Sequence, residues 1–191
     1  MLMDRLLANS LVRTWLAVVG VATLVLGASY AMVQQSTRLS ADDLPLSSAQ
    51  SAKQELENGS SPKDVVPTLK THLRADTSIF MVITDDSQHV LASSAVLDGQ
   101  TPLPPQGVFS FATYHNTDHF TWEPKPGVRL ATRVTNYGTG ANAGFIIAGQ
   151  SLQPYEDRIS TYTWIALAAW LAVIAWSYLL ILLPHAVRRR T

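Results

Sequence analysis

The stretch IFMVITDDSQHVLASSAVLDGQTPLPPQGVF, residues 79–109, decides the fold class. An apolar, β-prone run at 79–83, a polar turn at 85–88 and a returning run at 89–94 predict a β-hairpin. The proline and glycine residues of 97–107 predict a loop. Further strands are expected at 108–113, 119–122, 128–134 and 144–148.

The residues before this hairpin predict helices. The segment 47–57 is expected to form one helix, which Ser47 or Ser48 caps and Asn58-Gly59 ends. Ser61-Pro62 predicts the start of a second helix that reaches residue 72 or 73, although Pro67 lies inside it. Helices followed by sequential antiparallel strands predict an α+β domain, with N-terminal helices and an antiparallel sheet of about five strands.

Two apolar segments flank this domain. Residues 14–33 and 159–184 contain no charged side chain, and each is long enough to cross a hydrocarbon core of roughly 30 Å as a helix. The sequence therefore predicts two transmembrane helices. The expected divisions are an N-terminus 1–13, a helix 14–33, a domain 34–158, a helix 159–184 and a basic tail 185–191.

The flanking charges predict the orientation. The N-terminal end carries Arg5 and Arg13 against Asp4, and the C-terminal end carries only bases: Arg188, Arg189 and Arg190. Short basic ends face the cytoplasm. The 34–158 segment holds nine Lys and Arg against thirteen Asp and Glu, a net charge of −4, and is expected outside. We therefore predict a multi-pass protein of a bacterial cytoplasmic membrane with both termini cytoplasmic and the bilayer as a partner.

A cleaved signal peptide is the alternative for the first apolar segment. Ser29-Tyr30-Ala31 has the small-x-small pattern of a cleavage site. The apolar stretch is longer than the usual signal-peptide core of about 7–15 residues, and a long basic region precedes it. These features favour a retained helix, and the alternative stays open.

Small residues recur at helical spacing in both apolar segments. They allow close approach of another helix. One interpretation is a homodimer or a partner helix, and the other is that the two spans pack on each other. The residues are Gly20, Thr23, Gly27, Ala31, Ala168, Ala172 and Ala175.

Arg129, Arg133 and Tyr137 are the candidate ligand-binding residues. On a strand they share one face, because side chains alternate with a period of two. Arginine suits carboxylates, so the three can line a pocket for an anionic ligand. The alternative is that this face is solvated while Leu130, Thr132 and Val134 turn inward.

The sequence predicts no enzyme. The chain has no cysteine, which excludes a thiolate metal site and a cysteine nucleophile. His115 and His119 have a metal-like spacing, but Asn116-Thr117-Asp118 between them is turn-like, so surface histidines are favoured over a metal site. Ser93 and Ser94 lack a nucleophile elbow. We therefore expect no catalytic residue, no metal and no cofactor, and the scattered basic residues indicate no nucleic-acid partner.

The order of these motifs resembles a known family. A membrane helix, a helical lead-in, the hairpin IFMVITDDSQHVLASS, the loop LDG…PLPP and a GVRLATRV strand are followed by GFIIAGQSLQPYEDRI, which runs into a second membrane helix. This resembles the periplasmic sensor region, PDC/Cache-like and PAS-related, of bacterial membrane sensor histidine kinases. The resemblance implies a sensor domain that signals through its membrane helices.

The resemblance also implies parts that the sequence lacks. Such kinases continue into a HAMP linker and a kinase domain, whereas this chain ends with His185 and the arginine cluster. We expect either an orphan sensor module that signals to a separate partner or a receptor whose output part was cut off. The alternative function is a non-catalytic accessory protein that binds and stabilises another envelope protein.

Overall fold

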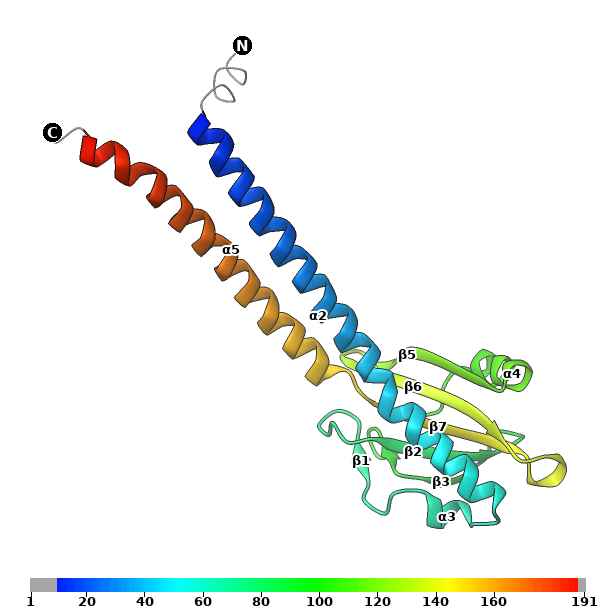
Figure 1. Ribbon diagram of the computed structural model, residues 1–191. Helices are drawn as coiled ribbons and strands as arrows, with labels where there is room; N and C mark the ends of the chain where they lie inside the picture. Colours follow the sequence, from blue (N-terminus) through cyan, green and yellow to red (C-terminus); the bar gives the residue numbers. More distant parts are fainter. Residues whose placement is uncertain (1–9, 189–191) are drawn as a thin grey trace. The chain divides into compact units, whose positions relative to one another are not determined.

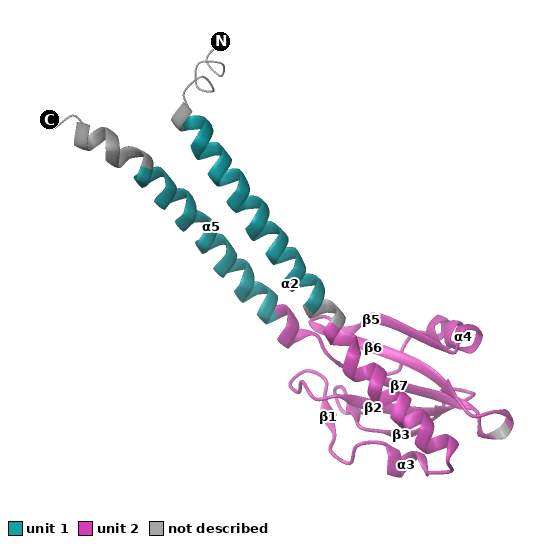
Figure 2. Cartoon of the chain, viewed as in Figure 1, with its two compact units in different colours: residues 1–36, 157–191 teal, residues 37–156 magenta. Residues whose placement is uncertain are grey.

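The computed structural model describes residues 10–188, with side chains described except at 10–11, 37–39, 141 and 181–188. The chain divides into two compact units (Figure 2): unit 1 is Met1–Ser36 with Asp157–Thr191, and unit 2 is Thr37–Glu156. The elements, drawn in Figure 1, are α2 (Ser10–Glu57), α3 (Pro62–Val65), β1 (Thr71–His72), β2 (Phe80–Asp85), β3 (Val90–Ser93), β4 (Ala95–Val96), α4 (Gln106–His115), β5 (Thr117–Lys125), β6 (Val128–Tyr137), η1 (Gly140–Asn142), β7 (Gly144–Ser151) and α5 (Gln153–Arg188).

Unit 2 is an α+β fold built on a five-stranded antiparallel sheet. Its strand order is β3-β2-β7-β6-β5, so the last strand, β7, lies at the centre beside the first, β2 (Figure 1). A small parallel pair, β1 with β4, lies outside this sheet. The expected α+β class, N-terminal helices and number of strands are confirmed.

One face of the sheet packs against α4 and the loop before it. Phe109 and Ala112 of α4 are buried there with Val82, Leu130 and other apolar residues of the sheet. Phe109 meets Phe145 of β7 edge to face, with ring centroids 5.2 Å apart. This is a favoured geometry for an aromatic pair.

The other face packs against the second half of α2. Small residues spaced three or four apart form the buried stripe of the helix: Ala41, Pro45, Ala49 and Ala52. They allow the helix to lie close to Met81, Ile83 and other residues of the sheet. Both faces of the sheet are therefore covered, which is why β7 is buried at every position.

The expected strands at 79–83, 119–122, 128–134 and 144–148 correspond to β2, β5, β6 and β7, and the strand expected at 89–94 to β3. The strand expected at 108–113 is wrong, because this segment belongs to α4. Its buried residues are spaced by three, as on one face of a helix, and Pro105 occupies the position before the first turn.

The helix boundaries also differ from expectation. The segment 47–57 is the end of the longer α2, which continues through Pro45 because that ring is fully buried against the sheet. Such packing outweighs the helix-breaking tendency of proline. The second helix is only α3, with Ser61 as its cap. It ends before Pro67, and Thr71–His72 forms β1 instead.

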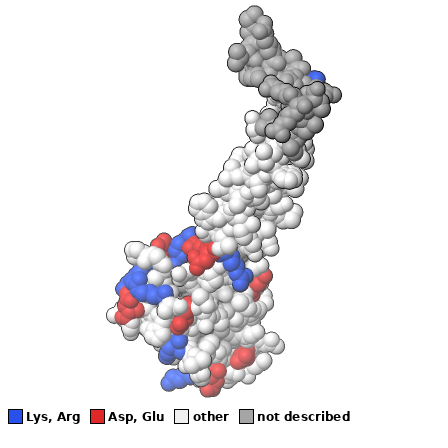
Figure 3. Space-filling model, turned by 90° about the vertical axis from the view of Figure 1, so that its left-hand side faces the viewer, with Lys and Arg blue, Asp and Glu red and all other residues white. Residues whose placement is uncertain are grey.

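Two helices are long and apolar enough to cross a membrane, over Val12–Glu57 and Gln153–Leu180. The share of the most apolar window that is buried is 0% in the first and 6% in the second, whereas core helices of soluble proteins are mostly buried. A signal sequence near the N-terminus passes the same test. On the face shown in Figure 3, Lys, Arg, Asp and Glu lie mainly on unit 2.

Candidate functional site

Arg129, Arg133 and Tyr137 share one face of β6, and each has a partner within unit 2. Arg129 forms an ion pair with Glu156. Arg133 donates from Nη1 to the Thr117 hydroxyl at 3.3 Å. Its buried Nε has no hydrogen-bond partner within the described part of the chain. An anionic ligand would therefore compete with Glu156 at Arg129, and it would not reach the buried Nε of Arg133.

Tyr137 is buried, with 8% of its surface exposed. Its hydroxyl donates to the carbonyl oxygen of Thr84 at 3.1 Å. Burial, and secondarily the charge of Asp85, raises the pKa of Tyr137. The side chain is thus held as a neutral packing group of the α2 face.

A pocket of about 550 Å³ lies between the loop after β4 and the end of β5. Its lining combines apolar side chains with polar groups at the rim. The apolar residues include Leu97, Leu103 and Trp122, and the polar ones include Gln100, Glu123 and Lys125. Such a mixture is typical of small-molecule sites, in which a few polar groups orient an apolar ligand.

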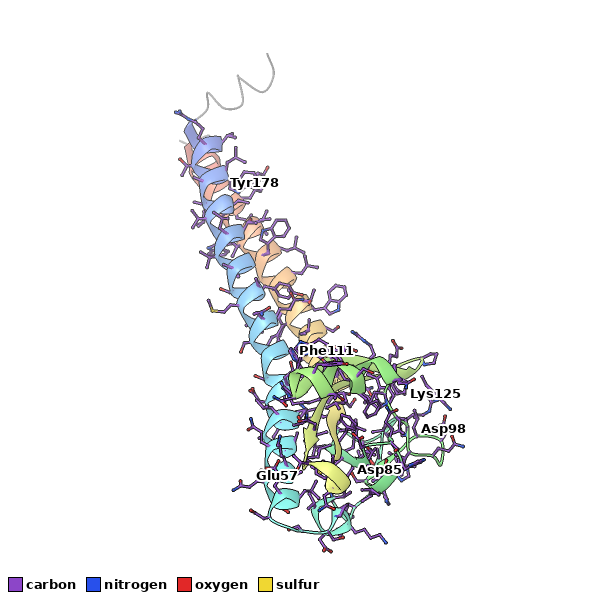
Figure 4. The ribbon with its side chains drawn as sticks, turned by 90° about the vertical axis from the view of Figure 1, so that its right-hand side faces the viewer. Glu57, Asp85, Asp98, Phe111, Lys125 and Tyr178 are labelled. Atoms are coloured by element: carbon purple, nitrogen blue, oxygen red, sulfur yellow. The ribbon has the colours of Figure 1, made fainter. Side chains whose placement is uncertain are left out.

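A charge cluster stands at this rim. Asp98 accepts two hydrogen bonds from Arg74, at 3.0 and 3.3 Å, and forms an ion pair with Lys125 (Figure 4). The hydrogen bond from Arg74, then that from Lys125, lowers the pKa of Asp98 well below its usual range. The cluster joins three separate segments of the chain, and two of its residues, Asp98 and Lys125, line the pocket.

The turn that presents Asp98 is tight. Asp98 and Gly99 both have positive φ angles, of 51° and 82°. Leu97 and Gln100 close the turn through two backbone hydrogen bonds of 2.8 and 3.1 Å. Two consecutive left-handed residues favour an Asp-Gly sequence, because glycine adopts positive φ without strain.

Gln150 of β7 contacts both long helices within unit 2. Its side-chain Nε2 donates to the carbonyl oxygen of Ala41 in α2 at 2.8 Å and to the hydroxyl of Tyr155 in α5 at 2.9 Å. Gln150 is only 3% exposed. One buried amide of the central strand therefore bonds to two helices that both also run into unit 1.

The first turn of α5 is held by further contacts to the sheet. The backbone N–H of Leu152 donates to the carbonyl oxygen of Arg129 at 2.9 Å, and the N–H of Gln153 donates to the hydroxyl of Ser151 at 3.2 Å. The Arg129–Glu156 pair adds a charged contact. A single residue, Leu152, separates β7 from α5, so a displacement of the strand's end displaces the helix.

In unit 1, hydrogen bonds between side chains that the structure describes join α2 to α5. Trp15 donates to Ser177 at 3.0 Å and Trp170 to Thr23 at 2.8 Å, while the hydroxyls of Tyr30 and Thr163 lie 2.8 Å apart. The partners recur at intervals of eight and seven residues on α2 and of seven residues on α5. This spacing keeps them on one seam, as in a coiled coil.

Two of the seven predicted small residues lie at or beside this seam. Thr23 belongs to it, and Gly27 lines an adjoining groove. A Cβ atom added at Gly20 or Gly27 would meet nothing within 4 Å. The remaining residues are exposed in the structure: Ala31, Ala168, Ala172 and Ala175.

The remaining predicted residues are the arginines near the two ends of the chain and the two histidines. Arg13 is exposed on α2, Arg188 is the last residue of α5, and Arg5, Arg189 and Arg190 lie outside the described residues. His115 and His119 belong to different elements, α4 and β5. His115 stacks on Phe111, labelled in Figure 4, with ring centroids 4.0 Å apart.

Sequence reasoning missed Gln150, the pocket and the hydrogen-bonded seam. A lone amide in the apolar run GFIIAGQSL is a signal for Gln150, because buried polar groups need partners. Trp, Thr, Ser and Tyr at seven-residue spacing inside apolar segments are the signal for the seam.

Comparison of the chain with protein-family models, with curated proteins and with solved structures gives no match. Function must therefore be inferred from the residues and their geometry.

Proposed function

We propose that this chain is a two-span membrane sensor module without catalysis. In this proposal unit 2 lies outside a bacterial cytoplasmic membrane, where it senses a small molecule or an envelope condition. Its two apolar helices carry the response to a separate membrane or cytoplasmic partner. The α+β fold and the helices before the sheet agree with what the resemblance to PDC/Cache-like, PAS-related sensor regions implies.

The contact of Gln150 with both helices is the observation that carries this proposal. A sensor must couple a change in its domain to its helices. Here the amide donates to Ala41 of α2 and to Tyr155 of α5, at 2.8 and 2.9 Å. A movement of β7 would therefore act on α2 and α5 at the same time.

The pocket beside Trp122 is the proposed ligand site. It has room for a molecule of metabolite size, at about 550 Å³. The apolar wall favours a ligand with an apolar part, and Lys125 and Asp98 at the rim favour a polar or charged end. A ligand would drive a response only if it bound the two arrangements of the domain with different affinity.

The test uses the full chain in lipid nanodiscs. A thermal-shift screen of amino acids, organic acids, nucleobases and divalent metals should find one class that stabilises the protein in a concentration-dependent way. Trp122→Ala should abolish that shift, whereas Thr121→Ala, on the opposite face of the same strand, should retain it. A shift that survives Trp122→Ala would place the ligand elsewhere.

Membrane orientation is tested separately. Because the chain has no cysteine, single cysteines can be introduced without background. Ser87→Cys, in the exposed turn after β2, should react with an impermeant maleimide on intact spheroplasts, and Thr191→Cys should react only after permeabilisation. The reverse pattern would overturn the proposed topology.

An accessory role is the second candidate. The open space at Gly20 and Gly27 favours it, because a partner helix can approach closely there. Recovery of a stoichiometric partner from membranes, lost on Gly27→Leu, together with no ligand in the screen, would support this role over sensing.

A further inference from the structure

Ala41 and Pro45 are four residues apart in the interior of α2. In a regular α-helix the N–H of residue 45 would donate to the carbonyl oxygen of residue 41. Proline has no N–H, and its ring also pushes against that carbonyl. The regular backbone donor for the Ala41 carbonyl is therefore missing.

The Ala41 carbonyl belongs to a buried part of α2. Ala41 is 2% exposed, and the Pro45 side chain is among those below 2%. A buried carbonyl without a donor is costly, so it must find one outside the helix backbone. Gln150 supplies it from β7, 109 residues away in sequence, at 2.8 Å.

The amide of Gln150 is also buried, and its other contact is the Tyr155 hydroxyl of α5. A displacement of α2 along β7 by even one residue would separate Ala41 from Gln150, so that the Ala41 carbonyl would lose its donor and the amide would keep only its bond to Tyr155. Packing alone would allow α2, whose buried residues are small, to shift by small amounts along the sheet. The hydrogen bond instead favours one discrete position.

We propose that Ala41, Pro45 and Gln150 form a latch that locks the register of α2 on β7. Pro45 makes the latch necessary, because it leaves the Ala41 carbonyl to the sheet. Gln150 then holds α2, and through Tyr155 it couples the latch to α5. Release of the latch is the step at which a change in the sheet would reach both helices, and only this last clause rests on the proposed sensor function.

Hydrogen exchange of the full chain in nanodiscs tests the latch without ligand or partner. Gln150→Leu should raise exchange in residues 46–57 of α2 by about ten- to hundredfold, since a buried carbonyl loses its donor. Pro45→Ala restores a backbone N–H opposite Ala41. In that background Gln150→Leu should raise exchange by less than about threefold.

Tyr155→Phe is the matched control. It removes the other hydrogen bond of the same amide but does not touch the Ala41 carbonyl. Its effect on exchange should therefore change much less between the two backgrounds than the effect of Gln150→Leu, because Tyr155→Phe leaves the bond from Gln150 to Ala41 in place. Equal effects of Gln150→Leu in the two backgrounds would overturn the latch.

A second variant covers loss of folding. If Gln150→Leu unfolds unit 2 in the parent chain, the latch requires Pro45→Ala with Gln150→Leu to fold and to restore protection. Failure of that double variant to fold would also overturn the proposal. Since these measurements need no ligand, a negative ligand screen would leave the latch standing, and a failed latch would leave the sensor proposal open.

Discussion

The hydroxyl of Tyr137 donates to the carbonyl oxygen of Thr84 at 3.1 Å, although β6 and β2 are separated by β7. The side chain reaches across Gly144, its register partner on β7. A Cβ atom at Gly144 would lie 2.1 Å from the Thr84 oxygen and 2.8 Å from the Tyr137 hydroxyl. This bridge therefore requires glycine at position 144.

Gly144→Ala should destabilise unit 2 by about 1–3 kcal/mol, the usual cost of forcing atoms into a packed core. Differential scanning fluorimetry of the full chain in detergent would measure it. Gly107→Ala is the control, because a Cβ atom there meets nothing within 4 Å. In helix α4 that change should be neutral or stabilising by up to about 1 kcal/mol. Equal melting temperatures for the two variants would contradict the bridge.

Alkaline pH should weaken unit 2 through Tyr137. Its pKa is raised, by burial first and by Asp85 second, so the folded state holds the phenolic proton more tightly than the unfolded state. The associated stability is complete below the ordinary tyrosine pKa of about 10 and is lost as pH rises above it. Tyr137→Phe should flatten this loss in urea-unfolding curves taken at a series of alkaline pH values. Tyr114→Phe, at an exposed position, should leave it unchanged.

Acid pH should weaken the cluster of Arg74, Asp98 and Lys125 beside the pocket. The pKa of Asp98 is lowered by Arg74 and Lys125, so the folded state binds its proton less readily than the unfolded state. The contribution is present above the ordinary carboxyl pKa of about 4 and fades as pH falls below it. Asp98→Asn should remove this part of the acid dependence in unfolding titrations. Asp86→Asn, in the exposed turn after β2, serves as the control, and an unchanged acid limb in Asp98→Asn would argue against the cluster.

The bond from Trp170 to Thr23 should help α2 and α5 of unit 1 to associate. Leu26→Cys with Ala166→Cys places a cysteine pair on the groove that both helices line. Trp170→Phe should slow disulfide formation by this pair about threefold, as one interhelical hydrogen bond in a bilayer contributes little. Trp176→Phe, which is 65% exposed, should not change the rate. Equal rates in the two variants would show that the seam does not depend on this bond.

Local patterns in the sequence determined much of this fold. The hairpin at 79–94 follows from two β-prone runs around a polar turn, and the buried strand β7 follows from its apolar run. The two apolar helices follow from length and absence of charge. Each of these features depends on neighbours in sequence, which is why it was predictable.

Tertiary structure decided the rest. The short apolar run at 108–113 is compatible with a strand and with a helix. The contact of Phe109 with Phe145 forms with this run as part of the helix α4. Local rules would end α2 at Pro45, yet the helix continues because its ring is buried and Gln150 bonds to Ala41. That donor lies 109 residues away, so no local pattern contains it. The cluster of Arg74, Asp98 and Lys125 likewise forms only when three distant segments of the chain fold together.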